Sequence, residues 1–157
     1  MGKMEFDLQD VALRLGAATA AGTLIGLNRD VLNKPIGMRT LGMVGLGTAI
    51  VTVAGIQFAD MASYPDPLSR VVQGIIQGVM AGISFIGAGV ILRNPATGTV
   101  DGLTTAATVW ITAALGISCG LGQWGISATG LGLTLLLLIV LPWLERRIIG
   151  GEDDRKN

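Results

Sequence analysis

The chain has 157 residues, of which 50% are hydrophobic and only 14% charged, and its mean hydropathy is +0.63. A soluble domain usually carries about a quarter charged residues, so this composition indicates a membrane protein. Eleven basic and eleven acidic residues give a formal net charge of zero, which leaves no basic excess to suggest a nucleic-acid partner. The chain has no histidine and one cysteine, Cys119. An intrachain disulfide, the usual Cys/His zinc sites and catalysis with an imidazole base are therefore excluded.

Five apolar segments follow one another, each close to the roughly 20 residues that a helix needs to cross a hydrocarbon core of about 30 Å. Their continuous apolar character favours helices over the alternating strands of a membrane barrel. We therefore predict an all-α membrane protein, in which residues 1–147 form a bundle of five transmembrane helices and residues 148–157 a polar C-terminal tail. The predicted spans are Leu8–Leu27, Arg39–Phe58, Arg70–Leu92, Leu103–Leu121 and Gly125–Leu144.

The loops predict the orientation, because Lys and Arg are enriched on the cytoplasmic side of a membrane. The first loop holds three basic residues against one acidic residue, and two consecutive arginines follow the fifth span. We expect the N-terminus outside and the C-terminus in the cytoplasm. Tyr64, Trp124 and Trp143 lie near span ends, as aromatic residues at a membrane interface do.

Small residues recur every four positions in the third and fourth spans. This spacing lets two helix backbones approach closely in lipid, where the hydrophobic effect does not drive helices together. We therefore predict that the hairpin from Gly74 to Gly120 is the packing centre of the bundle. A hydrophilic path along the threonines is the alternative. The residues expected at the contact are Gly74, Gly78 and Gly82 in the third span and Thr108, Thr112 and Gly116 in the fourth.

Polar residues gather where spans end on the predicted cytoplasmic side. An unpaired, partly buried charge is costly, so we expect Arg39 and Arg93 to pair with Asp30 or Asp101. Asp101 is also placed to cap the fourth span. Helix N-termini and arginines favour an anion here, and two carboxylates give little support for a Mg²⁺ site. Structural pairing and a ligand site remain alternatives for this cluster, whose members are Asn28, Arg29, Asp30, Arg39, Arg93, Asp101, Thr104 and Thr105.

Arg14 lies about two turns inside the first span. A charged residue in a spanning helix either reaches back to the interface along its own stem or marks a functional site. We expect the first of these roles.

Four segments resemble the MgtC/SapB family of bacterial inner-membrane proteins. They read GTLIGLNRD at 22–30, GMRTLGMVGLGTA at 37–49, GISFIGAGVILR at 82–93 and VDGLTTAATVWITAALGISCGLG at 100–122. The fifth span matches only as an apolar helix. The family's first motif usually reads Gly-Leu-Glu-Arg, and Asn28 stands here for the acidic residue, which argues against a carboxylate cation ligand at that position. Many relatives carry an ACT-like domain after the fifth helix, and this chain resembles a short form without it.

The resemblance implies a link to magnesium homeostasis and to virulence. It leaves two functions open. One is modulation of ion (Mg²⁺) or energy homeostasis through contacts with membrane partners, among which the resemblance suggests the F-type ATP synthase. The other is a small transporter or channel for Mg²⁺ or another ion, and a homo-oligomer is compatible with both. We expect the first, because the ionisable residues gather at one membrane boundary rather than near the midplane, and we expect no enzyme activity, metal ligand or cofactor.

Overall fold

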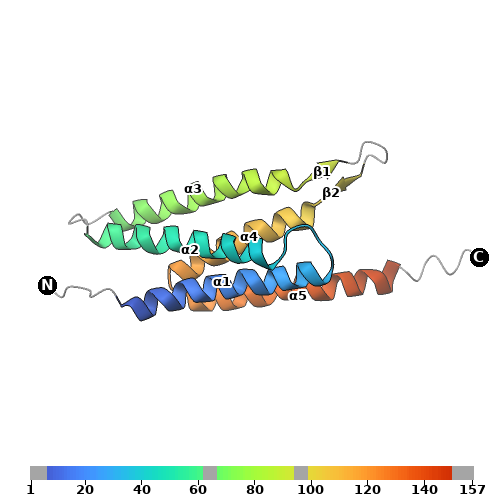
Figure 1. The fold of residues 1–157 in the computed structure, drawn as a ribbon, viewed down its shortest axis with the longest axis horizontal. Helices are drawn as coiled ribbons and strands as arrows, with labels where there is room; N and C mark the ends of the chain where they lie inside the picture. The colour runs from blue at the N-terminus through green and yellow to red at the C-terminus, as the bar shows by residue number, and fades with distance from the viewer. Residues whose placement is uncertain (1–6, 62–66, 94–98, 150–157) are drawn as a thin grey trace, which may run out of the picture.

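The computed structural model describes residues 7–61, 67–93 and 99–149, and these ranges contain five helices and one short β-ladder. Successive helices run in opposite directions, so the start of α1 and the end of α5 lie at opposite ends of the molecule (Figure 1). All five helices are long and apolar enough to cross a membrane. The predicted all-α bundle of five transmembrane helices is thus confirmed. The helices are α1 (Leu8–Val31), α2 (Met38–Met61), α3 (Pro67–Gly89), α4 (Leu103–Gly120) and α5 (Trp124–Ile149).

Three helices continue beyond their predicted ends, α1 to Val31, α2 to Met61 and α5 to Ile149. Helix α1 does not end before its charged residues Arg29 and Asp30. It ends where backbone hydrogen bonds close its last turn. Asn33 takes a left-handed conformation with φ 51°, which Asn tolerates better than most residues. The Lys34 amide donates to the Arg29 carbonyl at 2.9 Å and the Asn33 amide to the Asp30 carbonyl at 3.0 Å, which is the Schellman pattern. The last two residues of α5 fall in the predicted polar tail, of which residues 150–157 lie outside the described part.

A two-stranded antiparallel ladder joins α3 to α4 and was not predicted. It consists of β1 (Leu92–Arg93) and β2 (Val100–Asp101). The predicted cap of α4 by Asp101 is wrong: the N-cap is Gly102 at φ 89°, and no side chain caps the helix. The backbone of Asp101 is engaged in the ladder opposite Leu92. A side chain at Gly102 would also overlap the Val90 carbonyl, so this tight connection requires glycine.

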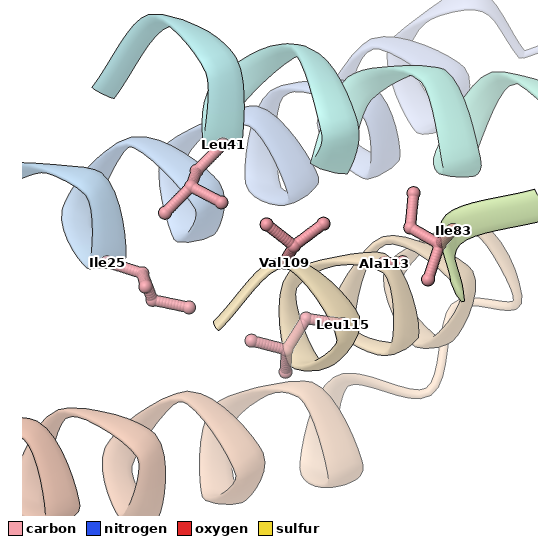
Figure 2. Packing of buried hydrophobic residues seen from close by; sticks show 6 residues of the cluster. All are labelled: Ile25, Leu41, Ile83, Val109, Ala113 and Leu115. Atoms are coloured by element: carbon pink, nitrogen blue, oxygen red, sulfur yellow. The ribbon is translucent and has the colours of Figure 1, made fainter. Parts of the chain in front are cut away.

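The central helix of the bundle is α4. In its membrane-crossing segment 61% of the residues are buried, against 6% in α3. Figure 2 shows the main apolar core, to which α1, α2, α3 and α4 all contribute. The core residues are Ile25, Leu41, Ile83, Val109, Ala113 and Leu115.

The closest helix contacts join α1, α2 and α4. A Cβ atom added at Gly22 of α1 would overlap the Leu41 carbonyl of α2. One added at Gly116 of α4 would overlap the Thr48 hydroxyl and lie 2.6 Å from the Gly45 carbonyl oxygen. These backbones approach so closely because neither glycine carries a side chain, as small residues allow in membrane helices.

The predicted glycine row of α3 does not take part in such contacts. Gly74, Gly78 and Gly82 are exposed, and no atom of another helix lies within 4 Å of a Cβ built on any of them. The packing centre is therefore α4 with α1 and α2, and the prediction that placed it in the α3–α4 hairpin is corrected. The spacing of small residues was the same in both helices, but only the α4 row faces neighbouring backbones.

The threonines of α4 lie in this packed centre. Thr108 and Thr112 are buried, and their hydroxyls donate to the carbonyls of Thr105 and Thr108, each at 2.7 Å. The Thr112 methyl lies 3.1 Å from a Cβ built at Gly22. Each hydroxyl is thus satisfied within its own helix, and Thr112 presents its methyl group to Gly22 of α1.

Candidate functional site

A groove of about 940 Å³ opens at the end of the bundle where α1 ends and α4 begins. This is also the end at which the β-ladder and the last turns of α5 lie (Figure 1). Polar residues from α1, the loop after it and the start of α4 form one wall, and leucines of α5 form another. The polar lining includes Arg29, Asn33, Lys34, Asp101, Thr104 and Thr105, and the α5 lining Leu137, Leu138, Leu141 and Pro142.

Arg29 is the least exposed charged residue of the groove, at 3%. It lies in the last turn of α1, where a positive charge interacts favourably with the negative end of the helix dipole. Its Nη2 donates to the Thr105 hydroxyl oxygen and so links α1 to α4. Within the described ranges its buried Nε has no hydrogen-bond partner, and no carboxylate forms an ion pair with Arg29. A buried cation with an unused donor is costly, which makes Arg29 the main candidate ligand-binding residue.

The start of α4 adds further donors to the same wall. The first hydrogen bond of this helix is from the Ala106 amide to the Gly102 carbonyl, at 2.9 Å. The amides of Leu103, Thr104 and Thr105 precede it and have no intrahelical acceptor. Because no side chain caps α4, its positive end is open toward the groove. Arg29 and Lys34 therefore share this wall with a helix N-terminus, which favours an anion, and the exposed Asp101 carboxylate is the opposing charge.

Other members of the predicted cluster do not line the groove. Asp30 Oδ2 accepts from the Met38 amide at 3.0 Å and so stabilises the start of α2. Arg39 is exposed, and within the described ranges no ion pair joins it to Asp30 or Asp101. The predicted pairing of Arg39 is therefore wrong, because Asp30 is used by the backbone of α2. Asn28 is half-buried, and its Oδ1 accepts no hydrogen bond from the part of the chain that the structure describes. The side chain of Arg93, and with it the predicted pairing, lies outside the described part of the structure.

The groove contains residues that sequence reasoning did not single out. Lys34 follows the left-handed Asn33, and the order Asn-Lys-Pro is itself a helix-stop signal. A helix end predicted from this signal would have placed Lys34 next to the end of α1. The leucines of α5 gave no comparable signal, because their place beside α4 depends on tertiary packing alone.

Arg14 lies at the opposite end of the bundle. Its Nε contacts Asp10 Oδ2 at 2.7 Å, and its Nη1 donates to the Gly120 carbonyl oxygen at 2.9 Å. Gly120 is the last residue of α4, so Arg14 places a positive charge at the negative end of that helix dipole. The side chain holds two helices together, a role beyond the expected reach to the interface.

The fold and its polar ends define a multi-pass helical membrane protein. Residues 15–147 match the MgtC family. Among similar proteins, SrpB of Synechococcus elongatus is 43% identical over 148 residues, covering 89% of this chain and 79% of SrpB. SapB of Bacillus subtilis is 36% identical over 144 residues, covering 88% of this chain and 60% of SapB. The Escherichia coli protein named "Putative magnesium transporter YhiD" is 37% identical over 139 residues, covering 87% of this chain and 63% of that protein.

This chain belongs to the MgtC family, as its four motifs predicted. It spans about three fifths of the length of SapB and YhiD. No solved structure matches it significantly.

Proposed function

We propose that this protein modulates ion (Mg²⁺) or energy homeostasis from the inner membrane, through helix contacts with other membrane proteins. The name of YhiD links a relative to magnesium, and family resemblance suggests the F-type ATP synthase as one partner. In this proposal the protein is neither an enzyme nor the pathway through which Mg²⁺ crosses the membrane.

The packed interior of the bundle is the observation that favours a modulator. Between α2 and α4, Gly116 leaves no space for even one added carbon atom. Thr48 and Thr52 of α2 are buried, and their hydroxyls donate to carbonyls of their own helix at 2.7–3.0 Å. A hydrated Mg²⁺ ion needs oxygen ligands and retains several waters, and the close contact between α2 and α4 leaves no room for such an ion. At Gly74, Gly78 and Gly82, by contrast, the outer face of α3 has no contact with another described part of the chain and can accept a partner helix.

Purified protein reconstituted in liposomes tests the proposal. We expect Mg²⁺ entry, followed with an internal fluorescent indicator, to equal that of protein-free liposomes. Affinity-tagged protein from magnesium-limited cells should retain ATP synthase subunits in mild detergent. Saturable Mg²⁺ entry that depends on the protein would contradict the proposal and establish the alternative, a small transporter.

The orientation is a second part of the proposal. Arg29, Lys34 and Arg39 lie at the same end of the bundle as the last turns of α5, and Lys and Arg prefer the cytoplasm. We therefore place the C-terminus inside and the N-terminus outside. Reporter fusions after Lys3 and after Arg147 should be active on opposite sides of the membrane, and activity of both on one side would contradict it.

A further inference from the structure

The groove at the end of α1 contains a cation whose hydrogen-bonding capacity is not used within the chain. A guanidinium offers five N–H donors, and for Arg29 the only acceptor observed in the described residues is the Thr105 hydroxyl. Its Nε is buried and has no partner. Because the Thr105 hydroxyl oxygen accepts this hydrogen bond, the hydroxyl group can still donate its proton to another acceptor. Arg29 and Thr105 both line the groove, so an acceptor with several oxygens placed there would give this pair further hydrogen-bond partners.

The other donors around the groove restrict the chemistry of that acceptor. Lys34 adds a second cation, and the open N-terminus of α4 adds backbone amides and a partial positive charge. Among the described lining residues Asp101 is the one carboxylate, so their formal charges sum to a positive value. Arginine, lysine and a helix N-terminus together favour a phosphate group over a cation or a neutral ligand.

The lining that α5 contributes to the groove is apolar. Leu137 and Leu141 of α5 are 53% and 42% exposed, and Leu138 also lines the groove. A free phosphate would leave this wall uncovered, whereas a phospholipid would place its phosphate on the polar wall and an acyl chain along the leucines. The combination of one cationic and one apolar wall thus favours a lipid.

The groove also lies at the level of an interface. Trp143 directly follows the groove residue Pro142, and it is 57% exposed with the Arg147 guanidinium 5.3 Å from the centre of its ring. Exposed tryptophans of membrane proteins concentrate at the headgroup level. The polar wall of the groove is therefore at the depth where a bilayer carries its phosphates.

We propose that this groove binds one anionic phospholipid, with its phosphate on Arg29, Lys34 and the first amides of α4 and an acyl chain along α5. Binding requires neither Mg²⁺ nor a partner protein. Its outcome can therefore be separated from that of the reconstitution experiment above.

The test uses the full chain in a neutral detergent at low salt, with bound molecules counted by native mass spectrometry. The probes are dioctanoyl phosphatidylglycerol, phosphatidylcholine with the same acyl chains, and inorganic phosphate. We expect one phosphatidylglycerol per chain, bound at least about tenfold more tightly than either comparator. Lys34→Gln should weaken binding about fivefold, since a lysine near an anionic lipid contributes on that order, and Arg29→Gln should weaken it more.

Arg39→Gln is the matched control, because Arg39 is an exposed cation at the same end of the bundle that does not line the groove. We expect it to bind phosphatidylglycerol like the unchanged protein. If Arg29→Gln fails to fold, the comparison of Lys34→Gln with Arg39→Gln still decides. Equal binding of the two lipids, equal binding of inorganic phosphate, or equal losses in those two variants would each overturn the proposal.

Discussion

Helices α3 and α4 carry the same spacing of small residues but lie in opposite environments. The α4 row, which includes Gly116 and Gly120, faces Thr48 and Thr52 of α2. The α3 row, Gly74, Gly78 and Gly82, faces no other described part of the chain. Both helices are apolar enough to cross a membrane, yet 61% of the α4 segment is buried and 6% of the α3 segment.

The difference shows that small residues at every fourth position permit close helix contact without determining where it forms. In α4 the close contact also depends on backbone groups and glycines of the neighbouring helices. The Gly45 carbonyl of α2 faces Gly116, and Gly22 of α1 approaches the Thr112 methyl. The three backbones form one dense unit, and α3 contributes to the core mainly through Ile83. We therefore expect substitutions in the α1–α2–α4 unit to matter far more than comparable ones in α3.

The largest effect is expected from Gly22→Leu, which places a side chain where the α2 backbone lies. Overpacking a dense core typically costs about 1–3 kcal/mol and occasionally more, and backbone cannot give way as a side chain can. We expect about 3 kcal/mol lower free energy of unfolding in detergent. Gly16→Leu on the same helix is the control, because no atom lies within 4 Å of its Cβ position. Equal losses in the two variants would contradict the close contact of α1 with α2.

A smaller loss is expected from Thr105→Val, which removes the acceptor of the buried Arg29. A hydrogen bond to a charged group contributes about 1.5–3 kcal/mol, so we expect a loss of about 2 kcal/mol. Thr104→Val, at the adjacent exposed position, should cost less than about 0.5 kcal/mol. Denaturant unfolding of both proteins measures the difference, and similar stabilities would show that the link from α1 to α4 is unimportant.

Arg14→Gln should reduce stability by about 1 kcal/mol, because it removes both the ion pair with Asp10 and the contact with the Gly120 carbonyl. Asp10→Asn removes only the partly exposed ion pair, which typically contributes less than about 1 kcal/mol. Thermal unfolding of the two variants separates these contributions. A loss in Asp10→Asn as large as in Arg14→Gln would mean that the cap of α4 contributes nothing.

The smallest effect concerns the two carboxylates near the groove. Asp30→Ala removes the acceptor of the Met38 amide and should cost about 1 kcal/mol, as loss of a helix cap does. Asp101→Ala should change the free energy of unfolding by less than about 0.5 kcal/mol, because its exposed side chain caps nothing. A larger loss of stability in Asp101→Ala than in Asp30→Ala would contradict this account and support the predicted cap of α4 by Asp101.

Much of the fold could be predicted from the sequence, because length and hydropathy alone define spans in lipid. The helix ends were predictable in principle: Asn33 and Gly122 are the left-handed residues that follow α1 and α4, and both residue types are typical of that position. Which glycine row faces a neighbour was not predictable, since it depends on how the helices are rotated against one another. The short ladder between α3 and α4 also had no signal in a stretch without a clear strand pattern.

The candidate site was predicted in part. The end of α1 and the start of α4 do meet, so Arg29, Thr104 and Thr105 share one groove with Asp101. The sequence suggested ion pairs because carboxylates and arginines were close in number and position. The structure instead uses Asp30 for the backbone of α2 and leaves Arg29 without a carboxylate in the described ranges. Charge counting does not reveal this, because backbone amides compete for the same carboxylates.

The central claim is that the bundle is organised around α4 rather than around α3. It is tested most directly by thermal unfolding, in one detergent, of Gly116→Leu and Gly78→Leu. Gly116→Leu would overlap Thr48 and crowd the Gly45 carbonyl, whereas Gly78→Leu extends into open space. We predict that Gly116→Leu unfolds at a much lower temperature than the unchanged protein and that Gly78→Leu unfolds at nearly the same temperature. A stable Gly116→Leu protein, or a loss of stability in Gly78→Leu of the same size, would contradict the claim.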